Sequence, residues 1–163
     1  MLLVDGWRML LKTISAFTVA HSVTLAAAVL GVVHVPPAPV EVMIAMSIVL
    51  LALELTRPLD APPTLARRYP WLIAFVFGLL HGLGFAGALA EVGIPPDRIA
   101  LALLSFNLGV ELGQLAFVMA MLVPVTLARP LAQRWPQVRL VPAYAIGALA
   151  VAWTFERVQR FWS

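Results

Sequence analysis

Three ionisable residues lie within long apolar stretches of this sequence, and their types and positions could support chemistry. His21 and His81 each lie in a stretch of more than 20 residues without Asp, Glu, Lys or Arg, and Glu111 interrupts a third stretch of this kind. An ionisable group at the centre of a membrane helix costs about 2.5–3.5 kcal/mol on insertion scales, so it needs a partner, a cavity or a ligand. Three such groups at matching depth predict one intramembrane site, for a metal ion or for protons.

An amide and a second acid extend this set. Asn107 precedes Glu111 by four residues and Gln114 follows it by three, so all three share one face of a helix. Imidazole suits nickel, zinc, copper and iron, and oxygen ligands widen the choice. The predicted ligands of a divalent cation are His21, His81, Glu111 and Asn107, with Glu54 as an exit acid. No residue pattern indicates a catalytic centre or an organic cofactor.

Each candidate also has a structural interpretation. Polar side chains can join membrane helices by hydrogen bonds, and glycines such as Gly82 permit close packing. The hydroxyls of Thr18, Ser22 and Thr24 are expected to bond back to their own helix. A structural subunit is therefore one alternative. A metal-dependent hydrolase with Glu111 as general base is another, but no second acid is placed for a leaving group, so a role other than an enzyme is favoured.

The composition indicates a membrane protein. Of 163 residues, 62% are hydrophobic and 12% are charged, whereas soluble domains have about 25% charged residues. Such a chain cannot cover itself with polar surface, so its partner is the lipid bilayer. The net charge of +3 does not indicate nucleic acid, because the basic residues lie in short connections between apolar stretches. Cysteine is absent, which excludes disulfides and thiolate ligands.

The pattern predicts an all-α fold, a polytopic transmembrane bundle in one domain over residues 1–163. About five spanning helices are expected, separated by proline-bearing breaks; they cover residues 10–33, 39–56, 70–91, 98–122 and 139–157. Pro124 is expected to kink or end the fourth helix. Basic residues concentrate before the first helix and after the second and fourth, which places the N-terminus in the cytoplasm and the C-terminus outside.

The sequence also indicates an internal repeat. His21 and His81 each follow a Phe by four residues and each precede a Pro-Pro pair. This pattern predicts two parallel helical hairpins. The two histidines, Glu54 and Glu111 lie 14 to 17 residues from the nearer proline pair, about 21–26 Å along a helix. The four side chains are therefore expected in one layer.

Three sequence strings resemble the signatures of the HupE/UreJ family of hydrogenase and urease accessory membrane proteins. They are FTVAHSVTL at 17–25, FGLLHGLGFA at 77–86 and FNLGVELGQ at 106–114. The resemblance covers the chain from about residue 8. It implies a multi-pass protein of the bacterial inner membrane that transports or handles a metal, nickel first, with zinc, copper, cobalt and iron as alternatives.

The chain departs from the family pattern at its start. Family members typically begin with a further helix that carries an Asp-His pair, whereas Asp5 is not followed by His. The departure leads us to expect a truncated start, a site that has lost some ligands, or a membrane partner or second copy that supplies the missing helix.

Overall fold

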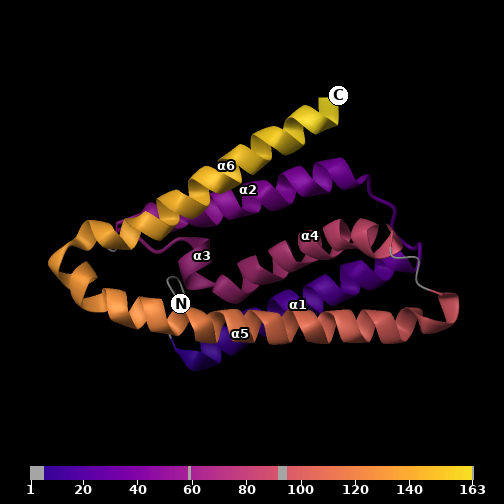
Figure 1. Cartoon of the computed structure of the whole chain (residues 1–163), viewed down its shortest axis with the longest axis horizontal. Helices are drawn as coiled ribbons and strands as arrows, with labels where there is room; N and C mark the ends of the chain where they lie inside the picture. Colours follow the sequence, from indigo (N-terminus) through magenta and orange to yellow (C-terminus); the bar gives the residue numbers. More distant parts are fainter. Residues whose placement is uncertain (1–5, 59, 92–94, 163) are drawn as a thin grey trace.

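The computed structural model describes residues 6–58, 60–91 and 95–162, and these residues form helices and connections without any strand (Figure 1). The long helices are α1 (Trp7–Val29), α2 (Pro37–Thr56), α4 (Pro70–Glu91), α5 (Ile99–Arg134) and α6 (Val141–Trp162). The short ones are α3 (Leu65–Arg68) and the 3-10 helices η1 (Pro96–Arg98) and η2 (Pro136–Leu140). The predicted all-α fold is confirmed.

Four helices in the described part of the chain are long and apolar enough to cross a membrane: α1, α2, α4 over Pro70–Gly87, and α5 over Ile99–Ala128. The protein is therefore a multi-pass membrane protein. The fifth predicted span corresponds to α6, which has 22 residues. Its last turns carry Glu156, Arg157 and Arg160, and it is not among these four candidates.

The connection between α1 and α2 is built from glycine and proline. Gly31 adopts a left-handed conformation with φ of 72°, and the amides of Gly31 and Val32 donate to the carbonyls of Ala28 and Ala27. These two bonds satisfy the last carbonyls of α1 in the pattern common at helix C-termini. Pro37 then begins α2, where its missing amide hydrogen costs nothing.

α5 is longer than the sequence predicted. The helix continues through Pro124 and Pro130 to Arg134, for 36 residues in all. The predicted end of this helix near residue 122 was therefore wrong. Thr126 donates its hydroxyl to the carbonyls of Leu122 and Val123 at 2.8 Å, a bond back to its own helix that threonine commonly makes. At about 54 Å the helix exceeds a hydrocarbon core of ~30 Å.

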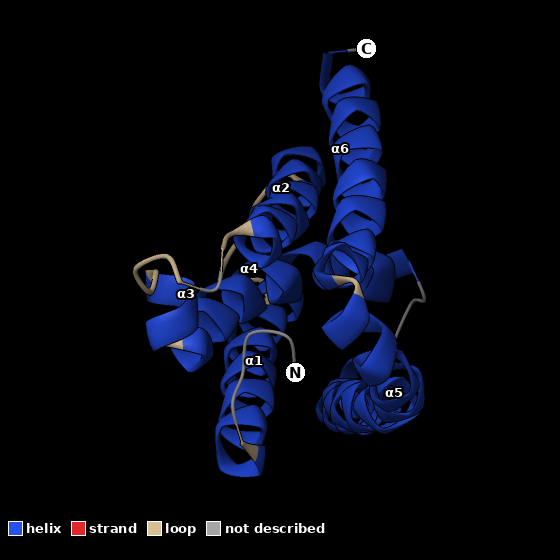
Figure 2. Ribbon diagram, turned by 90° about the vertical axis from the view of Figure 1, so that its left-hand side faces the viewer, coloured by secondary structure: helices blue, strands red, loops and turns tan. Residues whose placement is uncertain are grey.

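The closest helix pairs are α1 with α4 and α2 with α6, while α5 lies against α1 (Figures 1 and 2). The two helices of each predicted hairpin are not the closest pairs. Glycine explains the preference for α1 with α4: a Cβ at Gly78 would collide with the Phe17 carbonyl, and one at Gly82 with Thr24 and the His21 carbonyl. In lipid, helices associate mainly by such close packing of small residues.

Candidate intramembrane metal site

His21 lies at the centre of the α1 face that α4 and α5 cover, and only 1% of its surface is exposed. Its Nδ1 is 3.2 Å from Oδ1 of Asn107 on α5. Asn107 donates its amide to the carbonyl of Leu103 at 2.8 Å, which turns its oxygen towards the histidine. Because that oxygen can only accept, Nδ1 of His21 carries the proton and Nε2 carries a free lone pair.

His81 has the same arrangement on α4. Its Nδ1 donates to the carbonyl of Phe77 at 2.8 Å, one turn earlier on the same helix. A backbone carbonyl cannot donate, so Nε2 again carries the lone pair. Histidines that bind metals are commonly oriented in this way, by a hydrogen bond from the second ring nitrogen to an oxygen.

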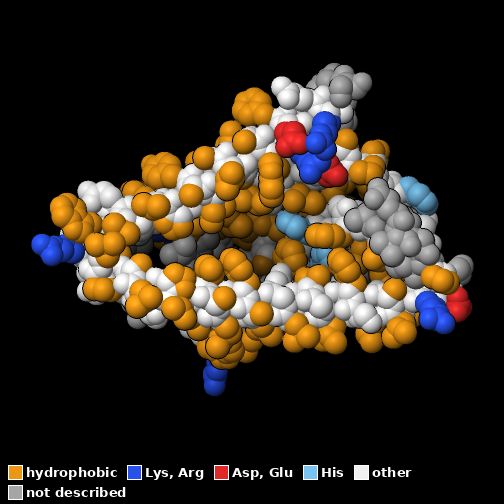
Figure 3. Space-filling model, in the orientation of Figure 1, with side chains coloured by type: hydrophobic (Ala, Val, Ile, Leu, Met, Phe, Trp, Pro, Cys, Tyr) orange, Lys and Arg blue, Asp and Glu red, His pale blue; other side chains and the backbone are white. Residues whose placement is uncertain are grey.

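Three phenylalanines surround the two imidazoles. Phe17 contacts both, with ring centroids 5.9 Å from His21 and 5.2 Å from His81. Phe85 and Phe106 contact His21 at 5.6 and 6.0 Å. The structure therefore brings the two histidines to a shared neighbour in an apolar setting. Histidine side chains are visible on the floor of a hollow beside α5 (Figure 3).

Some buried polar side-chain atoms on α1 and α5 lack a hydrogen-bond partner in the described part of the chain. Nε2 of His21, Oγ1 of Thr18 and Oε1 of Gln114 are buried and have no hydrogen bond within the described structure. We call these three residues, with Asn107 and Glu111, the polar seam. Buried polar atoms are normally paired, so these unpaired atoms are available to bind an ion or water.

The hydroxyls near His21 behave differently from one another. Ser22 donates to the carbonyl of Thr18 at 2.6 Å, and Thr24 donates to that of Ala20 at 3.2 Å. The prediction of local bonding is confirmed for these two. It was wrong for Thr18, whose hydroxyl is buried and has no hydrogen-bond partner among the described residues.

Glu111 lies one turn after Asn107 on the same face of α5 and is half-buried. It has no hydrogen bond or ion pair with any residue that the structure describes. Among the described residues, no three His, Asp or Glu side chains are close enough to hold an ion together. The arrangement therefore presents two imidazoles and an amide, with the carboxylate one turn away.

Glu54 lies apart from this site, at the C-terminal end of α2. Its Oε1 is 3.0 Å from Nε of Arg67, with the two side chains 10% and 18% exposed. The pair is an ion pair without hydrogen-bond alignment, because that oxygen has no bonded partner. Arg67 also donates to the carbonyls of Arg57 and Pro58 at 3.1 Å each, so it closes the end of α2.

Several residues near the site did not emerge from the sequence as candidates. Phe85 and Phe106 enclose His21, and the spacing of Phe85 four residues after His81 was the available signal. His34, the third histidine, lies on the α1–α2 connection. It carried no neighbouring polar pattern that would have singled it out.

The fold and site define a class: an all-α, multi-pass membrane protein with two oriented imidazoles, one of them buried, between its helices. The chain belongs to the HupE/UreJ family, because the family profile described as "HupE / UreJ protein" matches residues 1–157. The resemblance seen in the three sequence strings is thereby confirmed. No curated protein and no solved structure gives a match.

Proposed function

We propose that this protein binds a divalent cation, nickel first, between α1, α4 and α5, and carries it across the bacterial inner membrane or passes it to a partner. The ligands are Nε2 of His21, Nε2 of His81 and a group from α5. The N-terminus lies in the cytoplasm in this proposal, as the basic residues favour.

One observation carries the proposal. In both imidazoles Nδ1 is hydrogen-bonded and Nε2 keeps its lone pair, and Nε2 of His21 is buried without a partner. Leaving a buried acceptor unpaired costs about 1–3 kcal/mol. A helix-joining histidine would have both nitrogens bonded. Neutral imidazole Nε2 is a common ligand for borderline divalent metals.

Asn107 and Glu111 have separate roles in the proposal. Asn107 orients His21, as an oxygen bonded to the far nitrogen of a metal-binding histidine does. Glu111 is the carboxylate that completes coordination or carries the compensating proton, because a carboxylate in lipid must be protonated, paired or ligating. Glu54 is assigned to the closure of α2 with Arg67 and no longer to the exit of the ion.

Nickel binding to the purified protein in lipid nanodiscs tests the proposal. Isothermal titration should give about one nickel per chain for the wild type, and His21→Ala or His81→Ala should weaken binding by more than about 100-fold. The third histidine supplies the matched control, since His34→Ala removes an imidazole outside the site and should leave affinity unchanged. Equal affinity in all four proteins would leave only the structural interpretation.

A further inference from the structure

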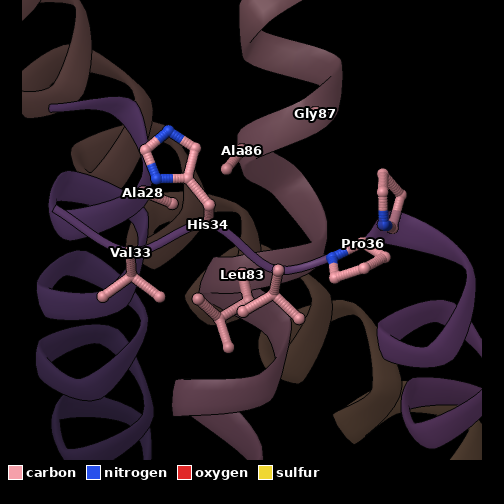
Figure 4. Close-up of a pocket in the computed structure, with 9 residues that line it drawn as sticks. Ala28, Val33, His34, Pro36, Leu83, Ala86 and Gly87 are labelled. Atoms are coloured by element: carbon pink, nitrogen blue, oxygen red, sulfur yellow. The ribbon is translucent and has the colours of Figure 1, made fainter. Parts of the chain in front are cut away.

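A second cavity, separate from the histidine pair, lies where α1 ends and α2 begins. It has a volume of about 420 Å³, and its walls come from α1, the α1–α2 connection and α4. Figure 4 shows the imidazole of His34 above Ala28 and facing Ala86 of α4, with Leu83 deeper in the cavity. A volume of this size is typical of small-molecule sites.

The cavity exists because the helices separate above the glycine contacts. At Gly82 the α4 backbone touches α1, whereas a Cβ at Gly87 would meet only Pro37, at 4.0 Å. The start of α2 forms another wall, because Pro37 lines the cavity and a Cβ at Gly84 of α4 would meet Ile44. A wedge between three helices therefore remains at this end of the bundle.

The position of the cavity relative to the membrane follows from its walls. α1 and α2 are both long and apolar enough to span a bilayer, and the cavity lies where one ends and the other starts. Ends of spanning helices lie at the boundary between hydrocarbon and lipid headgroups. The cavity therefore lies at the level where acyl chains join their glycerol and phosphate groups.

The lining decides what can occupy it. Among the described residues that line the cavity, His34 is the one with a polar side chain; the others are Ala28, Val33, Val35, Pro36, Pro37, Leu83, Ala86 and Gly87. A cation would lose its hydration shell in such an apolar cavity and would gain a single imidazole ligand. An acyl chain has no polar group to desolvate, and burial of each of its methylenes is favourable.

We infer that this cavity binds a membrane phospholipid, with one acyl chain between α1 and α4 and with the His34 imidazole bonded to the phosphate or ester oxygens at its mouth. The lipid fills the wedge between the three helices. The inference does not depend on the metal site.

Photo-crosslinking in nanodiscs tests the inference. Nanodiscs contain phosphatidylethanolamine and phosphatidylglycerol, with a small fraction of phosphatidylglycerol that carries a diazirine on one acyl chain. After illumination, cross-linked peptides are mapped by mass spectrometry. The wild type should concentrate cross-links on residues 28–37 and 83–87, above the level on the exposed face of α5.

Three variants make the result specific. Gly87→Leu fills the cavity without meeting backbone and should lower these cross-links by about tenfold, as displacement of a few buried methylenes does. Gly113→Leu is the matched control, since a Cβ there meets nothing within 4 Å, and should leave them unchanged. His34→Ala should lower them by about threefold, as loss of one hydrogen bond does.

Three outcomes would overturn the inference. Cross-linking equal to that on α5 would mean ordinary annular lipid, and equal cross-linking in the wild type and Gly87→Leu would mean that the cavity is not occupied. Competition by added nickel ions in the wild type, lost in His34→Ala, would make the cavity an entry site for the cation instead.

Discussion

The contact between α1 and α4 differs from the contact between α1 and α5 in how closely the helices approach. Gly78 and Gly82 bring the α4 backbone directly onto α1, whereas a Cβ at Gly109 or Gly113 of α5 would meet nothing within 4 Å. None of the most apolar part of α5 is buried, against a third of that of α1. The imidazoles therefore lie on a closely packed helix pair, and the amide and carboxylate lie on a more loosely packed helix.

Under the proposed function, this difference would let one site both hold and release an ion. The two imidazoles on the closely packed pair would keep their geometry, while Asn107 and Glu111 would move with α5. A small shift of α5 along α1 would bring Glu111 towards the histidines or take it away. The packing between α1 and α4 should therefore control stability, whereas substitutions on α5 should change metal affinity with little effect on stability.

The largest effect is expected from a side chain placed between α1 and α4. Gly82→Leu would collide with Thr24 and the backbone of His21, and overpacking against backbone should lower the free energy of unfolding by about 3 kcal/mol or more. Unfolding by denaturing detergent, followed by tryptophan fluorescence, measures this. Gly113→Leu on α5 should change stability by less than about 1 kcal/mol. Similar losses in both variants would erase the distinction between the two contacts.

A smaller loss is expected at the end of α2. Arg67→Ala leaves Glu54 without its ion pair and uncovers the last carbonyls of α2, which should lower the unfolding free energy by about 2–3 kcal/mol. Arg68→Ala, at an exposed neighbouring position, is the control and should cost less than about 0.5 kcal/mol. Nickel affinity should stay the same in both variants. A large loss of affinity in Arg67→Ala would return Glu54 to the metal pathway.

On α5, the expected effect is on binding more than on folding. Asn107→Leu removes the oxygen that orients His21 and should weaken nickel binding by about 10–100-fold, while the free energy of unfolding changes by about 1 kcal/mol. Titration calorimetry and detergent unfolding of the same samples separate the two. Asn107→Asp keeps an acceptor in place and should recover most of the affinity. Unchanged affinity in Asn107→Leu would make the amide a packing contact.

The smallest effect is expected at Thr18. Thr18→Val replaces a buried hydroxyl without a partner by a methyl group, so the metal-free protein should be as stable or more stable, by up to about 1 kcal/mol. Nickel affinity should fall by about threefold, because the polar seam loses one atom that can bind water around the ion. Clear destabilisation of the metal-free protein would mean that the hydroxyl has a structural partner.

The helices were predictable because length, apolar runs and prolines determine them locally. The start of α2 and both bounds of α4 agree with the predicted residues within two positions. Pro124 misled the prediction, because α5 continues through it to Arg134. The pairing of α1 with α4 depends on which glycine faces which backbone, and that is a property of three-dimensional packing that the hairpin pattern could not supply.

The candidate site was predictable in its residue types and only partly in its geometry. The charge-free stretches identified His21 and His81, and the helical face identified Asn107 beside Glu111. Equal distance from the turns did not decide which groups meet, because the direction of a side chain matters as much as its depth. Glu54, at a similar distance along the chain, faces Arg67 instead.

X-ray absorption spectroscopy of the nickel-loaded protein tests the central claim most directly. The account predicts a spectrum with two imidazole ligands in the wild type, reduced to one in His21→Ala and in His81→Ala and unchanged in His34→Ala. A nickel ion bound without imidazole, or with the same spectrum in His21→Ala and His81→Ala as in the wild type, would contradict it.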